Sequence, residues 1–253
     1  MNKVVGGAVG IRKLGEQEHF ERCVSLQIEV WGYDSGDVIP RKMFLLASKI
    51  GGQLFGAFDG EAMVGFAMAL PGYRNGMPYL HSHMLAVLPE YRNRGLGRRM
   101  KLAQREDAIA RGFSLMEWTF DPLEIRNAYL NICRLGAIVR RYEPNFYGAS
   151  SSPLQGGLPT DRLYAEWWLN SGGVTRHLEG EPERVEPLER IIVPAQIAAW
   201  KQDPPRRSLA EAVQRQNREL LQAAFERGLA VTGYERNKAG DGCFLLGPWQ
   251  GPA

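Results

Sequence analysis

Apolar residues recur along the chain with two spacings, and each spacing predicts one kind of element. Between residues 16 and 31 they fall three to four positions apart, which is typical of one face of a helix. Elsewhere they form short runs bounded by glycine, proline or aspartate, which is typical of strands. The pattern predicts strands at 9–14, 53–58, 62–70, 81–87, 115–120 and 138–142, and helices at 16–31, 40–50, 96–111 and 122–135.

The order of these elements predicts the fold class. It reads β-α-α-β-β-β-α-β-α-β, so a meander of strands is followed by two strand-to-helix crossovers. Meanders give antiparallel pairs, whereas crossovers through a helix join parallel strands. We therefore expect an α/β fold with a mixed central β-sheet and helices on both of its faces.

The composition changes after residue 148. Residues 148–161 are rich in serine, glycine and proline and predict a loop, which is followed by a strand at 162–169 and a polar linker at 170–187. A smaller β-α-β-β unit is predicted beyond the linker, with strands near 190–193, 229–235 and 243–246. The predicted domains are a core at 1–148, a loop with a closing strand at 149–172, and a C-terminal α/β extension at 173–253.

The sequence also predicts how this C-terminal part packs. The helix of the extension should begin at Ser208, which forms a capping-box signature with Glu211. The stripe expected to face the core consists of Leu209, Val213, Leu220, Ala224 and Phe225. Because neighbouring strand residues face opposite sides, one of Trp167 and Trp168 should point inward and the other outward.

The charge balance narrows the classes of ligand. Lys and Arg number 31 against 28 Asp and Glu, and the net charge of +3 is too small for a broad nucleic-acid-binding surface. The 3 cysteines show no CxxC spacing, so neither a disulfide framework nor a metal site is predicted. Without a signal peptide or the ~20 apolar residues of a membrane span, we expect a cytoplasmic protein with no membrane partner. Dimerisation through the C-terminal unit is left open.

One segment, VLPEYRNRGLGRR at residues 87–99, joins a predicted strand to a predicted helix. The N–H groups and partial positive charge of a helix start together form an anion site. Gly95 and Gly97 allow the backbone to approach a phosphate without an intervening side chain. Charge-assisted hydrogen bonds can come from four arginines, Arg92, Arg94, Arg98 and Arg99. A plain turn with solvated arginines is the alternative, and spacing alone leaves both open.

Two common nucleotide-binding loops do not fit this segment. A P-loop requires GxxxxGK followed by Ser or Thr, which is not found here. A Rossmann fingerprint requires a third glycine at the position of Met100.

The same segment resembles the acyl-CoA-binding motif of the GNAT superfamily of N-acetyltransferases. In that family a strand ending in V-x-P precedes Gln/Arg-x-x-Gly-x-Gly/Ala at the start of a helix, and the residues from Val87 to Gly97 match every position. Asn127, in a helix that ends in Leu135-Gly136-Ala137, is similar to the family's N…LGF segment. The resemblance spans about residues 9–147 and includes the order of elements.

This resemblance implies a cofactor site and an activity. The loop amides would hold the pyrophosphate of acetyl-CoA or another acyl-CoA, the cosubstrate. The residues implied in the cradle are Arg92, Asn93, Arg94, Gly95, Leu96, Gly97 and Arg98. Leu85 and Val87 would offer backbone groups to the pantetheine arm and thioester, and Asn127 would reach the cofactor from its helix. The implied activity is direct acyl transfer to an acceptor amine, and a non-catalytic CoA-binding module is the alternative.

The catalytic residues depart from the family's pattern. Many members carry a tyrosine four residues before the glycine of LGF, where this chain has Ile132. Tyr129, one turn earlier, is the substitute candidate for the general acid.

A proton acceptor is easier to propose. His81 stands eleven positions before Arg92, the first residue of the Gln/Arg-x-x-Gly-x-Gly/Ala motif, where the histone-modifying branch of the family has a glutamate base. His81 and His83 are expected on the side of the strand shared by Leu85 and Val87, and histidine has a suitable pKa for a base. Glu117 and Asp121 are further candidates, and Asp121 is expected instead to cap the following helix.

Acceptor recognition is expected near the end of the first helix and on the later strands. The candidates are Trp31, Tyr33, Asp34, Trp118, Tyr142, Asn145 and Tyr147. Core packing is the alternative for the aromatic residues among them, and for most it is favoured. The sequence specifies neither the acyl group nor the acceptor.

Overall fold

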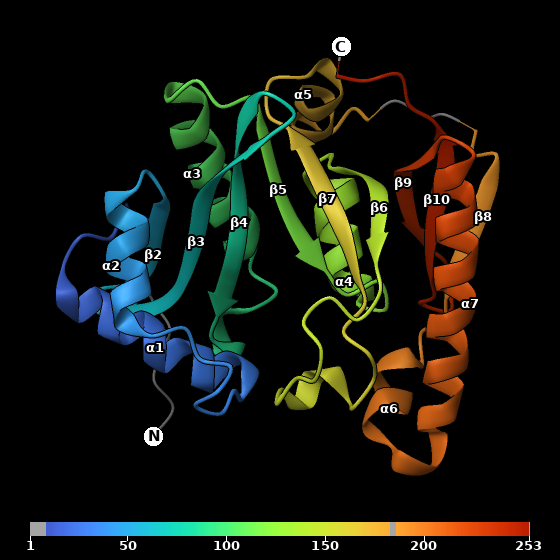
Figure 1. The fold of residues 1–253 in the computed structure, drawn as a ribbon, viewed down its shortest axis with the longest axis horizontal. Helices are drawn as coiled ribbons and strands as arrows, with labels where there is room; N and C mark the ends of the chain where they lie inside the picture. Colours follow the sequence, from blue (N-terminus) through green and yellow to red (C-terminus); the bar gives the residue numbers. More distant parts are fainter. Residues whose placement is uncertain (1–8, 183–185, 253) are drawn as a thin grey trace. The chain divides into compact units, whose positions relative to one another are not determined.

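The computed structural model describes residues 9–182 and 186–252 and divides into two compact units, Met1–Met116 and Glu117–Ala253 (Figure 1). The elements of the first unit are β1 (Gly10–Lys13), α1 (Gln17–Trp31), α2 (Arg41–Lys49), β2 (Gln53–Asp59), β3 (Ala62–Arg74), β4 (Met77–Val87), a 3-10 turn (Pro89–Tyr91) and α3 (Leu96–Ala110). Its strands lie in the order β1-β2-β3-β4, and each neighbouring pair is antiparallel.

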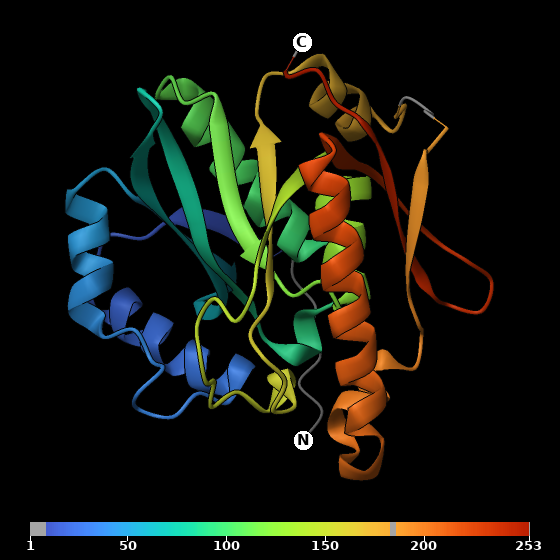
Figure 2. The ribbon, with the colours of Figure 1, turned by 45° about the vertical axis from the view of Figure 1, so that its right-hand side comes forward.

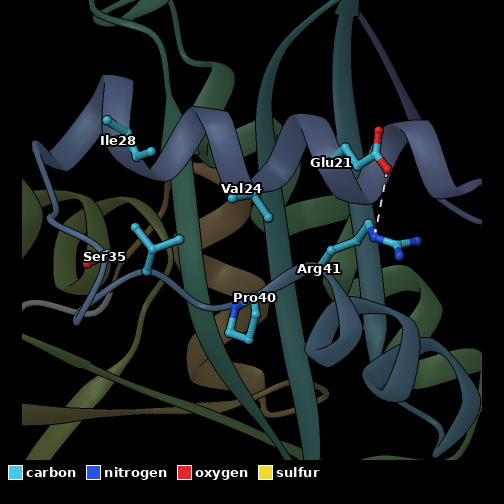
Figure 3. A pocket seen from close by; sticks show the side chains of 7 residues that line it. Glu21, Val24, Ile28, Ser35, Pro40 and Arg41 are labelled. Carbon is cyan, nitrogen blue, oxygen red and sulfur yellow. Dashed lines mark ion pairs between the residues drawn. The ribbon is translucent and has the colours of Figure 1, made fainter.

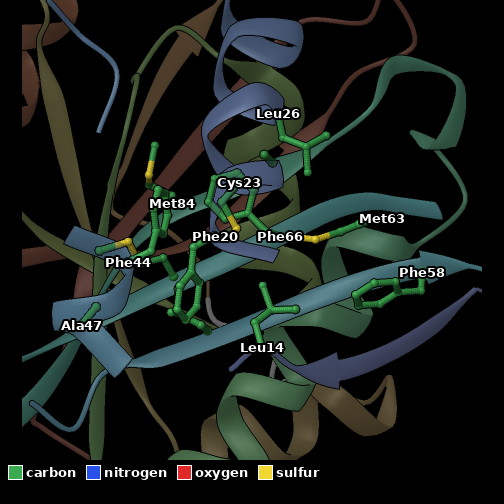
Figure 4. Close-up of a cluster of buried hydrophobic side chains, with 13 residues drawn as sticks. Leu14, Phe20, Cys23, Leu26, Phe44, Ala47, Phe58, Met63, Phe66 and Met84 are labelled. Atoms are coloured by element: carbon green, nitrogen blue, oxygen red, sulfur yellow. The ribbon is translucent and has the colours of Figure 1, made fainter. Parts of the chain in front are cut away.

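Helices cover both faces of these four strands. The larger apolar cluster joins α1 and α2 to the strands and includes Phe20, Phe44 and Phe66, all fully buried (Figure 4). The smaller cluster joins α3 to the opposite face through Leu96 and Met100. The α/β class with helices on both faces is thus confirmed.

Helix α1 has the predicted length but a different buried face. Gly32 ends it in the left-handed conformation, with φ 65°, and donates its N–H to Ile28 O at 2.9 Å. The buried side chains are Phe20, Cys23, Leu26 and Gln27, whereas Ile28, one of the evenly spaced apolar residues of this helix, is 52% exposed. The buried face therefore includes a glutamine, which an apolar pattern does not reveal.

The hairpin of β3 and β4 is longer than predicted. It continues past residues 70 and 81 to a two-residue turn at Asn75 and Gly76, where Arg74 pairs with Met77. Both turn residues have positive φ values, 51° and 79°, as a type I′ turn requires. The Asn-Gly dipeptide was the signal for this turn.

A β-bulge interrupts β4 near its middle. Met84 pairs with Met68 but His81 pairs with Leu70, so Ser82 and His83 together lie opposite the single residue Ala69. A bulge shifts the in-out alternation of side chains along a strand. Two residues an even number of positions apart lie on the same side of a regular strand. Across this bulge they lie on opposite sides.

The elements of the second unit are β5 (Leu115–Phe120), which begins at the unit boundary, α4 (Ile125–Ala128), a π-helical turn (Tyr129–Arg134), β6 (Ile138–Glu143), a 3-10 turn (Pro153–Gln155), β7 (Arg162–Trp168), α5 (Gly172–Glu179), β8 (Glu189–Val193), α6 (Ile197–Gln202), a second 3-10 turn (Pro204–Arg206), α7 (Arg207–Glu226), β9 (Leu229–Arg236) and β10 (Gly242–Pro248). The strand order is β5-β7-β6-β9-β10-β8. The predicted C-terminal β-α-β-β unit is present and joins β6 through β9. The predicted domain boundaries stay predictions.

Several C-terminal predictions were wrong. Residues 170–187, predicted as linker, contain α5, whose N-cap Ser171 accepts a hydrogen bond from Val174 N–H. Helix α6 was not predicted. Helix α7 begins before Ser208 and has Arg206 at its N-cap, without a side-chain cap bond, so the capping box is absent.

The packing face of α7 is also rotated from the predicted stripe. This helix lies along β6, β8 and β9 (Figure 2). Leu209 and Leu220, expected inside, are 47% and 42% exposed. The residues that α7 buries are Ala210, Gln214, Asn217, Leu221 and Ala224. Two of them are polar and bind backbone carbonyls, since Gln214 donates to Pro159 O and Asn217 to Ile192 O.

The prediction for the two tryptophans is confirmed. Trp167 is fully buried, and its indole N–H donates to Leu135 O at 2.7 Å. Trp168, on the other side of β7, is half-buried and lies 6.1 Å from Trp249 between ring centroids.

A buried carboxylate ties α7 to the segment between β6 and β7. Asp161 is fully buried and accepts two hydrogen bonds from Arg218, both at 2.9 Å. It also accepts the Tyr142 O–H at 2.5 Å and the Asn145 N–H at 2.9 Å. One carboxylate therefore satisfies four donor contacts.

Candidate functional site

The predicted anion loop lies between β4 and α3 in the first unit. Asn93 and Gly95 adopt positive φ values of 61° and 74°, which turn the chain sharply into the helix. Gly95 is the N-cap of α3, and its carbonyl accepts the Arg99 N–H at 3.0 Å. The amides of Leu96, Gly97 and Arg98 come before this bond and have no acceptor inside the helix. These three N–H groups are therefore the candidate start of an anion cradle.

Contacts with the sheet hold this loop in place. The Tyr91 hydroxyl donates to Asp59 Oδ2 at 2.8 Å, and this hydrogen bond, with burial, raises the pKa of Tyr91. Leu88 N–H donates to Val64 O, and Leu96 is buried beside Met100. The loop is therefore anchored at both of its ends.

The arginines of the loop bring positive charge to the cradle. Arg92 Nε donates to Val87 O at 3.0 Å, and Arg99 Nη2 donates to Val9 O at 2.5 Å. Carbonyl oxygens carry no net charge, so neither of these two bonds neutralises its guanidinium group. Arg94 is exposed and lies 6.0 Å from the Tyr91 ring centroid. The loop thus combines positive charge with the amides of a helix start, which suits a polyanionic phosphate.

The two histidines lie at the β4 bulge, with ring centroids 6.0 Å apart. His81 pairs with Leu70, which packs in the cluster under α1 and α2. Leu85 and Val87 instead pack in the cluster under α3. The expectation that His81 shares their side was wrong, because the bulge shifts the alternation between residues 81 and 85.

Protonation of His83 should cost stability. Burial lowers the pKa of His83 from its ordinary value of 6.5. Below pH 6.5 the unfolded chain then binds more protons than the folded chain, so stability falls with acidification. We expect the free energy of unfolding to fall more steeply below pH 6.5 in the wild type than in His83→Gln, by at most about 1.4 kcal/mol per pH unit. Urea unfolding at several pH values measures this, and parallel curves would contradict it.

A polar network supports the bulge from the α3 side. Lys101 Nζ donates to Ser82 Oγ at 2.7 Å, and the Ser82 hydroxyl donates to Gln104 Oε1 at 2.9 Å. All three side chains are buried, and burial lowers the pKa of Lys101 well below its usual range. Sequence reasoning missed this network, because a lysine and a glutamine on a helix are ordinarily solvated.

The second unit carries the remaining cofactor and acid candidates on α4 and the π-helical turn. Asn127 is exposed, and Tyr129 is 40% exposed. Ile132, at the family's usual tyrosine position, is fully buried. A single continuous helix was expected here, but the π-helical turn widens it, and such turns are frequent at functional sites.

The other proton-acceptor candidates are already bound to cations. Glu117 is fully buried and accepts a hydrogen bond from Arg141 at 2.7 Å. Asp121 lies 2.8 Å from the Lys201 ammonium and accepts the Leu123 N–H. Asp121 therefore closes the turn before α4, whereas the N-cap of α4 is Glu124.

The acceptor candidates divide into buried and exposed groups. Trp118 packs edge-on against Trp167 at 5.8 Å, and Tyr142 binds Asp161, so both are part of the packed interior. Tyr147 is 46% exposed, and Asn145 is exposed as well. Trp31 and Tyr33 stack at 5.4 Å at the end of α1, where Asp34 is exposed.

A groove of about 530 Å³ lies between α1 and the loop that leads to α2 (Figure 3). Its lining residues are Glu21, Val24, Ile28, Ser35, Val38, Pro40 and Arg41. Glu21 and Arg41 form an ion pair at 3.7 Å. Buried Gln27 fixes the loop by a double hydrogen bond, donating to Ile39 O at 3.0 Å and accepting Ile39 N–H at 2.8 Å.

Among the described residues, no group of His, Cys, Asp and Glu side chains is arranged to hold a metal ion. Nor does the described part of the chain contain a helix with the length and apolar character needed to cross a membrane.

Comparison with solved structures shows the fold. A GNAT-family protein of Desulfovibrio desulfuricans is 14% identical with a TM-score of 0.53, covering 64% of this chain and 99% of that chain. The ribosomal-protein-S18-alanine N-acetyltransferase of Escherichia coli is 16% identical with a TM-score of 0.52, covering 66% and 97%. The yncA structure of Salmonella typhimurium, with its cofactor acetyl-CoA, is 14% identical with a TM-score of 0.52, covering 65% and 95%.

The comparison with curated proteins finds no match. The family model of the acetyltransferase (GNAT) family matches residues 20–129, which include β4, the anion loop and α3. Both the strand-loop-helix geometry and the solved structures agree with this match. The chain therefore contains an acetyltransferase domain of the GNAT family at residues 20–129.

Proposed function

We propose that this protein transfers an acetyl or other acyl group from acyl-CoA directly to an amine of an acceptor. The observation that carries the proposal is the loop between β4 and α3, where the helix-start amides of Leu96, Gly97 and Arg98 lie in the same short segment as the arginines Arg92 and Arg99. Membership of residues 20–129 in the GNAT acetyltransferase family supports acyl-CoA-dependent acetyl transfer in general.

The acyl donor is acetyl-CoA or another acyl-CoA. The cradle residues named above, Arg92 to Arg98, bind its pyrophosphate through backbone amides and arginines. A Cβ at Gly95 would meet nothing within 4 Å, so the approach to the loop is open. Leu85 and Val87 offer backbone groups to the pantetheine arm, and Asn127 is the further residue proposed to contact the cofactor. When bound, the thioester supplies an activated acyl carbon.

Acyl transfer also requires two proton transfers, one from the acceptor nitrogen and one to the departing sulfur. The acceptor nitrogen must lose one proton, and His81 or His83 takes it at the bulge of β4. Because burial lowers the pKa of His83, this imidazole is neutral at pH 7 and ready to accept a proton. The departing sulfur gains a proton from Tyr129, whose side chain is 40% exposed and therefore accessible.

The groove beside α1 is the candidate acceptor region. Its walls come from α1 and from the loop that leads to α2, and they combine apolar side chains with the Glu21–Arg41 ion pair. An amine-bearing acceptor with an apolar portion fits this lining. A screen of small-molecule amines and protein amines shows which kind of acceptor the protein uses.

A non-catalytic CoA-binding module is the second candidate function. The fully buried Ile132 favours it, because the usual tyrosine acid is absent from that position. A single measurement distinguishes the two functions. Release of the CoA thiol in the presence of an amine supports transfer, whereas stoichiometric binding without thiol release across many amines supports the module.

Thermal unfolding with CoA, acetyl-CoA and longer acyl-CoAs tests the proposed site. A ligand that binds only the folded state stabilises it by about 2.7 kcal/mol at 100 times its Kd. For a chain of this size we expect the melting temperature to rise by roughly 5–10 °C. The acyl-CoA with the largest rise then enters the amine screen. A folded protein whose melting temperature responds to none of these ligands would contradict both candidate functions.

A further inference from the structure

A buried polar network holds the middle of the His81-Ser82-His83 segment, and all of its members belong to the first unit. Ser82 contacts α3, where its hydroxyl accepts a hydrogen bond from Lys101 Nζ at 2.7 Å and donates one to Gln104 Oε1 at 2.9 Å. The exposed fractions of Ser82, Lys101 and Gln104 are 4%, 3% and 0%. Water therefore does not compete for these hydrogen bonds, and they are stronger than they would be on the surface.

The backbone ladder alone does not fix this segment. In the β-bulge of β4, Ser82 and His83 together lie opposite the single residue Ala69 of β3. A bulge leaves its extra residue without a ladder partner and changes the direction of the side chains of the strand. The ladder is therefore disrupted at the place where the directions of both imidazoles are decided. The hydrogen bonds between Ser82 and α3 supply the missing constraint.

Lys101 occupies its buried position at a cost to stability. Burial lowers the pKa of Lys101 well below its usual range, because the folded protein disfavours the charged form of this side chain. An apolar side chain of similar length, such as methionine, would fill the same space without that cost. Residues that oppose stability are expected where function requires them. Lys101 binds the residue that lies between the two proton-acceptor candidates, His81 and His83.

We infer that Lys101 is a positioning residue for acyl transfer, which fixes the bulge of β4 through Ser82 and thereby the directions of the His81 and His83 imidazoles. The inference rests on the proposed function, which gives one of these histidines the proton of the acceptor amine. Their ring centroids lie 6.0 Å apart, so a rotation of the segment moves both rings relative to a bound amine. Lys101 itself is buried, so it acts through Ser82 and is not a catalytic residue.

Nuclear magnetic resonance of the full chain tests the structural half of this inference without any substrate. The chain has 4 histidines, so the Cε1–H resonance of each can be assigned with single histidine-to-glutamine variants. In Lys101→Met the resonances of His81 and His83 should move by more than their line widths at about pH 8.5, where histidine is ordinarily neutral. Those of His19 on α1 and His177 on α5 should stay in place. Unmoved His81 and His83 resonances in the folded variant would overturn the inference and leave the proposed function intact.

Thiol release from acetyl-CoA, with the amine that the screen selects, tests the catalytic half. Lys101→Met should lower kcat about tenfold, because a misplaced proton acceptor slows the chemical step. The KM for acetyl-CoA should stay within about twofold, since the cradle residues are unchanged. Ser82→Ala should lower kcat at least as much. If Lys101 acts through Ser82, adding Lys101→Met to Ser82→Ala should change kcat by less than about twofold. A further loss of about tenfold in the double variant would overturn the inference.

Asp107→Asn is the matched control. Asp107 lies on the same helix, its side chain is 9% exposed, and it accepts hydrogen bonds from Gln53 of β2 and from Arg111. The control weakens these bonds and should lower the melting temperature, whereas Lys101→Met should not lower it. The kcat and the imidazole resonances of the control should match those of the wild type. An equal loss of kcat in both variants would show a general effect on α3 and would overturn the inference.

Ser82→Ala decides the question if Lys101→Met does not fold. It removes both hydrogen bonds of the Ser82 hydroxyl with the loss of a single oxygen atom, and the same two measurements apply to it. A folded Ser82→Ala variant with the kcat of the wild type overturns the inference alone. Wild-type protein from which no amine accelerates thiol release contradicts the proposed transfer, and the inference falls with it.

Discussion

A Gly97→Glu variant is expected to bind CoA at least about 100-fold more weakly than the wild type. Gly97 is the second residue of α3, within the group of amides that have no acceptor inside the helix. A glutamate there places its own carboxylate beside these amides and repels the pyrophosphate. The same carboxylate favours the start of a helix, so the fold should not lose stability. Titration calorimetry with CoA measures the loss.

Gly173→Glu is the control for this change. Gly173 is the second residue of α5, and a Cβ there would meet nothing within 4 Å. The control thus adds the same side chain at the same position of another helix. It should bind CoA with the affinity of the wild type. A folded Gly97→Glu variant with unchanged affinity would show that the loop is not the pyrophosphate site.

The largest effect on stability is expected from Asp161→Ala, which should lower the free energy of unfolding by about 3–5 kcal/mol. The substitution removes the acceptor of both Arg218 bonds, of the Tyr142 hydroxyl and of the Asn145 N–H. Burial and the hydrogen bond to Asp161 raise the pKa of Tyr142, so the freed group is a neutral phenol without its acceptor. Urea unfolding measures the difference.

A surface ion pair gives the comparison. Glu235, which is 52% exposed, binds Arg190 between β9 and β8. Glu235→Ala removes one carboxylate from an ion pair, as Asp161→Ala does, but water can solvate the arginine that is left. We expect a loss of less than about 1 kcal/mol. Similar losses of unfolding free energy in the two variants would mean that burial of Asp161 does not increase its contribution to stability.

Local signals explain which parts of the fold could be predicted. The strand at 115–120 was predicted to the residue because it is a short apolar run between polar ends. Helix α1 was predicted because Gly32 provides the left-handed stop that ends it. The anion loop followed from the glycines and arginines themselves, and the geometry of Gly95 at the N-cap of α3 agrees with that prediction.

The failures have a different physical origin, since they depend on partners far away in the chain. The side chains of Gln214 and Asn217 are buried because backbone carbonyls at Pro159 and Ile192 accept their hydrogen bonds. Nothing near α7 in sequence indicates those carbonyls. The β4 bulge is likewise a property of pairing with β3, and it decides the side on which His81 lies. Lys201 donates a hydrogen bond to Asp121, which lies 80 residues earlier in the sequence.

The contact between Cys133 and Tyr234 affects the order in which the structure forms during translation. The Cys133 thiol donates to Tyr234 O at 2.6 Å, across 101 residues. Ribosomes add roughly 5–20 residues per second, so several seconds separate these two residues during translation. The helix that carries Asn127 and Tyr129 gains this contact only after β9 has emerged from the ribosome. A nascent chain that already contains the whole motif region therefore still lacks part of the support of its helix.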